Sequence, residues 1–427
     1  MILNQKNREE FIFEGCDTVE LAKKYGTPLY VVSETFILEK CREIREDFLN
    51  KYPGNQAVFA CKAFQTLEMC RIIDREGLGL DVVSGGELYT AIKAGVPMDK
   101  IIFHGNNKTL DEIRMAVDHR VGRIVVDNAY ELEEINKYAK EKDTIVPILF
   151  RVTPGVDSHT HKFISTGHLD SKFGIPLDRR VRNGYIEKAI EMSNVELKGF
   201  HFHVGSQLLE NTSHLAAVDI LAKLMRDVKE ELSFETLEVN LGGGFGIRYV
   251  KEDERKNLTY FTDAMMDRIY LKCNEYELRV PRVTIEPGRW IVGEAGITLY
   301  TIGSIKEIPD IRTYVAIDGG MADNPRPALY EAKYNAVVAN KFKQPIDGLV
   351  TIAGKCCESG DILIYDLPVP KLASGDILAV LSTGAYNYSM ASNYNRIPKP
   401  PVIMVKEGKD RLIVKRETYD DLISREI

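Results

Sequence analysis

One lysine in this chain of 427 residues stands where it could act as a nucleophile. The run AVFACKAF, residues 57–64, predicts a buried strand that ends near Lys62, because aromatic and small apolar residues follow one another without helical spacing. Poor solvation lowers the pKa of an ammonium group, and a neutral amine can form a Schiff base with an aldehyde. A lysine that merely reaches from a strand end to water is the common alternative.

A glycine cluster and an arginine offer groups that bind a phosphate. NLGGGFG, residues 240–246, contains three consecutive glycines, whose backbone N–H groups can converge on an anion without obstruction by a Cβ atom. The cluster lacks the Lys-Ser/Thr pair of a P-loop, and alone it would also fit a flexible loop. EPGR, residues 286–289, adds Arg289, which can bind the same anion.

A glutamate and two histidines complete the chemistry. Glu286 can hold a ring nitrogen protonated, which makes a pyridinium a strong electron sink, or it can form a structural ion pair. His201 and His203 in HFHVGSQ face the same side if they lie in one strand. They could ligate a metal, although no third ligand is evident, or stack on a cofactor ring, or simply pack, and Ser206 could donate to phosphate. Together with Lys62 these residues indicate pyridoxal phosphate.

The segments that carry these residues alternate between strands and helices. The expected strands are residues 57–61, 78–83, 100–103, 123–126, 146–151, 197–203, 237–241 and 282–286. Crossovers between them predict parallel pairing, and eight strands close a (β/α)8 barrel of the TIM type, with a doubly wound open sheet as the alternative. The barrel is favoured because polar groups gather at the C-terminal strand ends: Lys62, Asp81, Ser84, His104, Asp127, Arg151, His203, residues 242–244 and Glu286.

Beyond residue 289 the pattern changes to strands without long helices. The expected strands are residues 299–308, 313–317, 349–352, 362–365, 377–381, 402–405 and 411–414, which predict a C-terminal antiparallel β domain, a barrel or a sandwich. A strand at residues 27–33 is surplus to an eight-stranded barrel, and we expect it to join the β domain. The predicted domains are therefore the barrel at 34–286 and a discontinuous β domain at 1–33 and 287–427.

Composition narrows the class of protein. Hydrophobic residues make up 44% of the chain, and the net charge of −7 gives no basic surface for nucleic acid. Seven cysteines, an odd number at irregular spacings, indicate reduced thiols in the cytoplasm. The polar N-terminus lacks the apolar core of a signal peptide, and no apolar run is long enough to span a bilayer, so we expect no membrane association.

Ten motifs in order carry a resemblance to a known family. Over nearly its whole length the chain resembles the alanine-racemase-like (fold type III) pyridoxal-phosphate decarboxylases, and within them the branch that acts on meso-2,6-diaminopimelate. The motifs are ACKAF (60–64), GLDVVSGGEL (79–88), GNNKT (105–109), SKFGI (171–175), HFHVGSQ (201–207), GGGFG (242–246), EPGRWIV (286–292), RPALY (326–330), CESGD (357–361) and GAYNYSMASNYN (384–395).

The resemblance implies a role for each matching residue. Lys62 would be catalytic and carry pyridoxal 5'-phosphate. The other cofactor-binding residues would be Asp81, His203, Ser206, Gly243, Gly244, Glu286, Pro287, Gly288, Arg289 and Tyr386. Arg289, Arg326, Tyr330 and Tyr386 would bind substrate, and Glu358 would bind its distal ammonium. Cys357 would be the catalytic proton donor, delivered to the barrel of a partner subunit, so that the active sites lie at a homodimer interface; a plain buried thiol is the alternative. No metal is implied.

The implied activity is decarboxylation of meso-2,6-diaminopimelate to L-lysine and CO2, the last step of lysine synthesis, by a carboxy-lyase. A substrate with a distal ammonium and carboxylate needs both an arginine and an acid, which Arg326 and Glu358 would supply, whereas an ornithine or arginine decarboxylase needs only the acid. A racemase would need a second base. A non-catalytic regulator should have lost Lys62, Cys357 or a phosphate ligand, and all are present.

Overall fold

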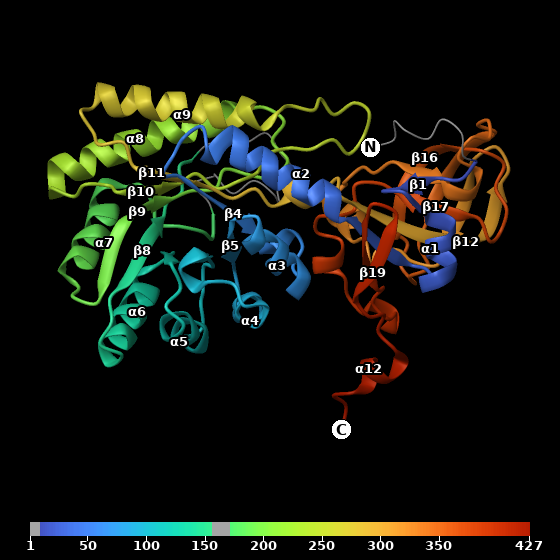
Figure 1. The fold of residues 1–427 in the computed structure, drawn as a ribbon, viewed down its shortest axis with the longest axis horizontal. Helices are drawn as coiled ribbons and strands as arrows, with labels where there is room; N and C mark the ends of the chain where they lie inside the picture. Colours follow the sequence, from blue (N-terminus) through green and yellow to red (C-terminus); the bar gives the residue numbers. More distant parts are fainter. Residues whose placement is uncertain (1–8, 156–170) are drawn as a thin grey trace. The chain divides into compact units, whose positions relative to one another are not determined.

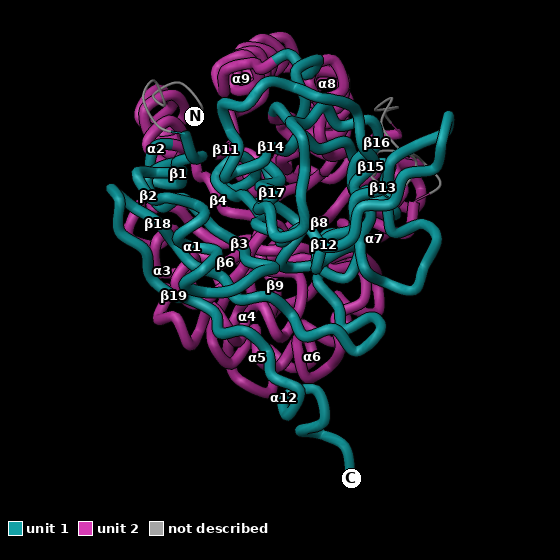
Figure 2. Tube along the Cα trace, turned by 90° about the vertical axis from the view of Figure 1, so that its right-hand side faces the viewer, with its two compact units in different colours: residues 1–39, 248–254, 291–427 teal, residues 40–247, 255–290 magenta. Residues whose placement is uncertain are grey.

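The structure, a computed structural model, describes residues 9–155 and 171–427. The first part of the polar N-terminal stretch, residues 1–8, lies outside the described residues. The chain divides into two compact units (Figure 2): unit 1 comprises residues 1–39, 248–254 and 291–427, and unit 2 comprises residues 40–247 and 255–290. The sequence predicted divisions at residues 33/34 and 286/287. It gave no sign that the short segment 248–254 belongs with the β-rich unit 1.

Unit 2 is a closed barrel of eight parallel strands (Figure 1), so the prediction of a barrel is confirmed. Most of the strands are short and largely apolar, and their order around the barrel follows the order of the sequence. The strands are β4 (Gln56–Ala60), β5 (Gly79–Val82), β6 (Ile101–Phe103), β7 (Arg123–Val126), β8 (Val146–Arg151), β9 (Val195–His201), β10 (Glu238–Asn240) and β11 (Arg282–Ile285). β11 pairs with β4, with Thr284 opposite Gln56, and this pairing closes the barrel.

Helices connect the strands and begin at polar caps. They are α3 (Leu67–Arg75), α4 (Gly85–Ala94), α5 (Leu110–Asp118), α6 (Ala129–Glu141), α7 (Arg179–Glu191), α8 (Thr212–Leu232) and α9 (Leu258–Glu275), with α2 (Glu34–Ile44) preceding the barrel. The side chains of Thr66, Ser84, Thr109 and Asn128 each accept a hydrogen bond from the first turn of the helix that follows. Ser84, expected among the polar groups of the rim, is therefore the cap of α4.

The interior of the barrel is a packed layer of aliphatic side chains. Val58, Ile102, Val125 and Leu149, from β4, β6, β7 and β8, form one buried cluster. Burying side chains of this size stabilises a fold by about 1.5–3 kcal/mol each. The strand ends are thus fixed relative to one another, which is what a rim of functional side chains requires.

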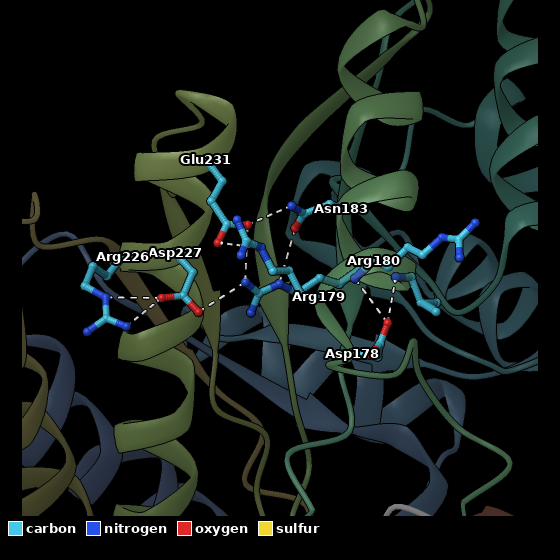
Figure 3. Close-up of polar contacts among 9 residues, drawn as sticks. Asp178, Arg179, Arg180, Asn183, Arg226, Asp227 and Glu231 are labelled. Atoms are coloured by element: carbon cyan, nitrogen blue, oxygen red, sulfur yellow. Dashed lines mark hydrogen bonds and ion pairs between the residues drawn. The ribbon is translucent and has the colours of Figure 1, made fainter.

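Helices α7 and α8 are joined by a polar network (Figure 3). The buried guanidinium of Arg182 lies 3.1 Å from Asp227 and 3.6 Å from Glu231, both on α8. Asn183 donates to Glu231 at 2.7 Å, and Arg179 pairs with the same carboxylate at 3.0 Å. A shared, partly buried cluster of this kind holds two helices in register better than isolated surface pairs do.

Unit 1 is built on a β-sheet that takes in the N-terminal strand. The sheet runs in the order β16 (Ile362–Val369), β15 (Gly348–Ala353), β13 (Arg312–Ile317), β12 (Gly296–Ile308), β3 (Leu29–Ser33), β18 (Val402–Lys406) and β19 (Lys409–Val414). β3 pairs with β12 and β18, with Tyr30 opposite Thr298 and Val402, as expected for a strand that belongs to the β domain. The sheet is not purely antiparallel, because β13 with β15 and β3 with β18 are parallel pairs.

Two further features complete unit 1. The three-residue strand β14 (Ala336–Val338), which the sequence did not indicate, pairs with β17 (Ile377–Val380), and β17 also pairs with β12. The core beneath β3, β12 and β18 includes Leu29, Val31, Leu299 and Ile403, all fully buried.

Across the described part of the chain, no helix combines the length and the apolar character that crossing a bilayer requires.

Candidate active site

Lys62 lies in a single helical turn, η2 (Cys61–Ala63), directly after β4. Cys61 and Ala63 are buried, whereas Lys62 is exposed. The sequence predicted a poorly solvated lysine at the end of a buried strand, whereas the residue is exposed. β4 ends at Ala60, two residues earlier than Lys62, and the turn buries the residues on either side and leaves Lys62 exposed.

Glu286 follows β11 and is the centre of a buried polar cluster. Its Oε1 accepts a hydrogen bond from the Asn240 amide at 2.7 Å, lies 2.9 Å from His104 Nε2 and lies 3.6 Å from His201 Nε2. Burial alone would raise the pKa of Glu286, but His104 and His201 outweigh it and hold the pKa well below the usual range. Glu286 is thus an ionised carboxylate in a water-poor site.

The two histidines of HFHVGSQ do not form a pair. β9 ends at His201, so His203 lies beyond the strand, and the two-residue period that would place both rings on one side does not reach it. Burial lowers the pKa of His201 to about 3, which leaves this ring neutral. His201 packs edge-on against His104, with ring centroids 4.7 Å apart.

The cluster of His104, His201 and Glu286 also has the composition of a metal site. The potential ligand atoms lie within 4.8 Å of one another, and all three residues are buried. His104, which directly follows β6 and was expected at this rim, is the third member of the group. Among the described residues, Nε2 of His104 and of His201 approach the carboxylate without forming a hydrogen bond to it.

Groups suited to a phosphate meet at a second part of this rim. Arg289, which begins the short helix α10 (Arg289–Val292), donates from Nη2 to Ser206 Oγ at 2.8 Å. The backbone N–H of Gly243 donates to Nδ1 of His203 at 3.3 Å, which places the ring proton of neutral His203 on Nε2. Burial, together with the charge of Lys62, lowers the pKa of His203 well below its usual value.

Close packing requires the glycines of the loop. A Cβ atom on Gly243 would lie 2.1 Å from the carbonyl oxygen of Glu286, and one on Gly244 would lie 2.2 Å from that of Gly205. Gly244 also has φ +91°, a left-handed conformation that side chains rarely adopt. The loop is thus pressed against the ends of β9 and β11, where any larger residue would displace it.

Two acids beside this cluster, the buried Asp81 and the half-buried Glu87, have a raised pKa. Burial raises the pKa of Asp81 to about 6, against the opposing effect of His104, whose Nε2 is 3.6 Å away. Burial likewise raises the pKa of Glu87 to about 7, and its Oε2 accepts from the Val83 N–H at 2.8 Å. Glu87 lies in the motif GLDVVSGGEL, for which the sequence predicted no role at this position. Its place in the first turn of α4, directly after β5, could have marked it as a residue of the rim.

In unit 1, Arg326 is enclosed by tyrosines. It begins helix α11 (Arg326–Tyr330), is buried, and donates to Tyr334 Oη at 2.6 Å. Its guanidinium lies 5.0 Å from the ring centroid of Tyr249 and 6.0 Å from that of Tyr386. Tyr386 has φ +65°, an uncommon conformation for a non-glycine residue that the surroundings must hold in place. Tyr330, on the same short helix, is half-buried.

Cys357 and Glu358 lie on an exposed loop of the same unit. The backbone N–H of Cys357 donates to Asn395 Oδ1 at 2.6 Å, and Glu358 Oε1 accepts from the Gly360 N–H at 3.3 Å. The buried carboxylate of Asp361 fixes the loop, because it accepts from the N–H groups of Cys356 at 2.8 Å and Met321 at 2.6 Å. Cys357 is exposed, and the alternative of a plain buried thiol is wrong.

Comparison with known proteins identifies the family. The pyridoxal binding domain of the pyridoxal-dependent decarboxylases matches residues 37–293. A diaminopimelate decarboxylase of Bacillus subtilis (strain 168) is 47% identical over 97% of this chain and 94% of its own length. That of Bacillus methanolicus is 50% identical over 97% and 96%. The chain belongs to the diaminopimelate decarboxylase family.

Solved structures agree with this family at the level of the fold. A diaminopimelate decarboxylase from M. jannaschii in complex with L-lysine superposes with a TM-score of 0.92, at 37% identity, over 99% of this chain and 96% of that one. Pyridoxal phosphate as the cofactor is confirmed by the matched pyridoxal binding domain.

The residues present fit this cofactor. Enzymes that use a pyridoxal ring as an electron sink need a partner for the ring nitrogen, and Glu286 is a buried carboxylate whose pKa is held low by His104 and His201. They need donors for a phosphate, and the hydrogen-bonded pair Arg289 and Ser206 carries such donors. They need an accessible amine, and Lys62 is exposed beyond β4.

Proposed function

We propose that this protein catalyses the pyridoxal-phosphate-dependent decarboxylation of meso-2,6-diaminopimelate at its D centre, giving L-lysine and CO2. The observation that carries the proposal is Glu286, a buried carboxylate whose pKa is held low by His104 and His201, in a chain 50% identical to one diaminopimelate decarboxylase. A cofactor whose ring nitrogen must stay protonated needs such a carboxylate beside that nitrogen. The reaction would be the last step of lysine synthesis, in the cytoplasm, where the seven free cysteines stay reduced.

Each residue then has a defined task. When bound, the cofactor supplies an electron sink for the pair left at Cα as CO2 departs. Glu286 would hold a proton at the ring nitrogen, and Lys62 would hold the cofactor at its aldehyde carbon. His203, with its Nδ1 engaged by Gly243, presents a neutral ring for stacking. Ser206, Gly243, Gly244 and Arg289, with Asp81, Pro287, Gly288 and Tyr386, complete the cofactor site.

The substrate end rests on unit 1. The cage of Tyr249, Tyr334 and Tyr386 holds the guanidinium of Arg326 in one place, where it can bind a carboxylate bidentately. Arg289, Tyr330 and Tyr386 would contribute to carboxylate binding, and Glu358 would bind the distal ammonium. Cys357 would return a proton from Sγ to Cα, which a thiol can do near neutral pH.

We further propose that two copies of the chain form a homodimer, in which unit 1 of one copy supplies Cys357 and Glu358 to the barrel of the other. Unit 1 has a groove of about 880 Å³ beside this loop, lined by Gly360, Tyr334 and the strand β16. Leu349 and Tyr365, each 62% exposed, add large apolar surface on the neighbouring strands β15 and β16. Exposed apolar surface of this kind is typical of an interface.

The test is CO2 release from the cofactor-loaded protein with meso-diaminopimelate, L-ornithine, L-arginine and L-lysine in parallel, with the product identified by mass. We expect release from meso-diaminopimelate alone, with L-lysine formed. Release from L-ornithine or L-arginine instead would contradict the roles of Arg326 and Glu358. No release from any of them, or loss of chirality without CO2, would contradict the reaction itself and favour a regulator or a racemase.

A control variant separates chemistry from folding. Lys62→Ala should keep the fold and its thermal unfolding midpoint in the absence of cofactor, because the lysine is exposed. It should lose the visible absorbance of the attached cofactor and about 10³-fold or more of the activity.

A further inference from the structure

Asn240 ends β10 at the start of the glycine cluster and is fully buried. Its side chain makes two hydrogen bonds of opposite kinds. Nδ2 donates to Glu286 Oε1 at 2.7 Å, and Oδ1 accepts from the backbone N–H of Gly242 at 3.0 Å. Because one partner is a carboxylate and the other an N–H group, the amide has a single orientation that satisfies both.

The backbone around Asn240 reinforces these two bonds. Its carbonyl oxygen accepts from the N–H of Phe202 at 3.0 Å, and the N–H of Glu286 donates to the carbonyl of Gly242 at 2.8 Å. The glycine loop and the strand end that carries Glu286 are therefore tied together twice, once through backbone and once through the Asn240 side chain. The next residue of the loop, Gly243, is the one that donates to His203.

All three polar contacts to the Glu286 side chain converge on Oε1: Asn240 at 2.7 Å, His104 at 2.9 Å and His201 at 3.6 Å. Oε2 is then the oxygen that would face the ring nitrogen of the cofactor. The amide of Asn240 fixes the rotation of the carboxylate and supplies an N–H group that favours its charged form.

We propose that Asn240 is a positioning residue that aims the Glu286 carboxylate at the cofactor ring and locks it to the glycine loop that faces the phosphate. One buried side chain thereby sets the distance between the two ends of the cofactor site. The inference rests on the proposed role of Glu286 and goes beyond it, since it assigns the aim and charge of that carboxylate to a residue that does not touch the substrate.

Asn240→Asp is the sharpest test, because it keeps the shape and the acceptor for Gly242 but replaces the donor to Glu286 with an oxygen. Two carboxyl groups would then share one buried site, among Asp81, His104, His201, Arg151 and Lys62, and one of them must take up a proton. We expect the pH midpoint at which the visible absorbance of the bound cofactor changes to shift by about 1 unit or more. We also expect about 10–100-fold weaker cofactor binding and a similar fall in kcat, with KM little changed.

Asn55→Asp is the matched control. Asn55 Oδ1 also accepts a hydrogen bond from a backbone N–H, that of Val283 at 2.8 Å. Val283 lies near the start of β11, whereas Glu286 follows the end of that strand. This variant should leave the cofactor absorbance and its pH titration as in the wild type. If Asn240→Asp behaves like Asn55→Asp in titration and cofactor affinity, the proposal is wrong.

A second variant pair shows whether Asn240 acts through Glu286. In the background of Glu286→Gln, the change Asn240→Asp should shift the absorbance titration and the cofactor affinity no further, whereas independent effects that multiply would contradict the proposal. If Asn240→Asp fails to fold, Asn240→Ser is used in both backgrounds. These readouts need only bound cofactor, so they remain decisive if no CO2 is released, and that result would overturn the proposed function alone.

Discussion

At the scale of single residues, two neighbouring cysteines have opposite surroundings. Cys356 is buried, and burial together with the carboxylate of Asp361 raises the pKa of its thiol to about 11. Cys357 is exposed and held by a hydrogen bond from its own N–H to Asn395. Of the seven cysteines, Cys357 alone is exposed, which supports the role of proton donor proposed for it.

Cys357→Ala should lower kcat by about 10²-fold or more, because the return of a proton to Cα loses its donor. Cofactor binding, followed by visible absorbance, should stay as in the wild type, since Cys357 is not among the residues proposed to bind the cofactor. Cys356→Ala is the control and should retain most of the activity. Equal losses in the two variants, or loss of cofactor in Cys357→Ala, would remove Cys357 from its proposed role.

Asp323 makes the stability of unit 1 depend on pH. It is buried, and burial raises the pKa of its carboxyl to about 7, although Tyr300 and the Gly320 N–H donate to it. The folded state therefore binds this proton more tightly than the unfolded chain, whose aspartates titrate near 4. The stabilising contribution is complete below about pH 4 and is lost as the pH rises through about 7.

Asp323→Asn removes this titration. Between pH 4 and pH 8 the wild type should lose about 2–4 kcal/mol of unfolding free energy that the variant does not lose, as measured by denaturant unfolding. Asp366→Asn, a change of an exposed aspartate on β16, should leave the pH dependence of the wild type intact. An Asp323→Asn curve parallel to that of the wild type would contradict the assignment.

At the scale of elements, the pair α7 and α8 depends on Arg182. Its side chain is 8% exposed and lies against Asp227 and Glu231, and this proximity helps to hold the pKa of both carboxyl groups below the usual range. Arg182→Met keeps the aliphatic stem but leaves the carboxylates without this partner, so it should destabilise unit 2 by about 1–3 kcal/mol in thermal or denaturant unfolding. Arg180→Met, at an exposed position of the same helix, should change stability by less than about 0.5 kcal/mol.

The elements also show what the sequence could predict. The bounds of β7 and β8 were predicted correctly, because each is a continuous apolar run with a polar residue or turn at its ends. The end of β9 at His201 was missed, since the apolar Phe202 and Val204 continue the pattern after the ladder ends. The three residues of β14 are too few to give a periodic signal.

The candidate site was predictable in composition but not in contacts. Motifs named Lys62 and Glu286, yet the exposure of Lys62 depends on where β4 stops, and the partners of Glu286 come from β6, β9 and β10. Such contacts arise from closing the barrel, which brings strands distant in sequence to one rim. Asn240 could have been suspected as a polar residue at the end of a buried strand before the glycines. Tyr249 could not, because only folding places it on Arg326.

At the scale of the whole molecule, the proposed homodimer makes each active site depend on two chains. A Lys62→Ala copy would contribute an intact Cys357, and a Cys357→Ala copy would contribute an intact Lys62. When the two inactive variants are unfolded and refolded together, half of the dimers should be mixed, and each mixed dimer should contain one complete site of two. The mixture should then recover about a quarter of the wild-type CO2 release from meso-diaminopimelate.

The recovery distinguishes shared sites from sites within one chain. If Cys357 served the barrel of its own chain, each mixed dimer would have one site lacking Lys62 and one lacking Cys357, and activity would stay at the level of the separate variants. As a control, co-refolding Lys62→Ala with Lys62→Arg should recover nothing in either arrangement. Because the amine and the thiol lie in different compact units, this exchange tests the arrangement of the assembly without disturbing the fold of either unit.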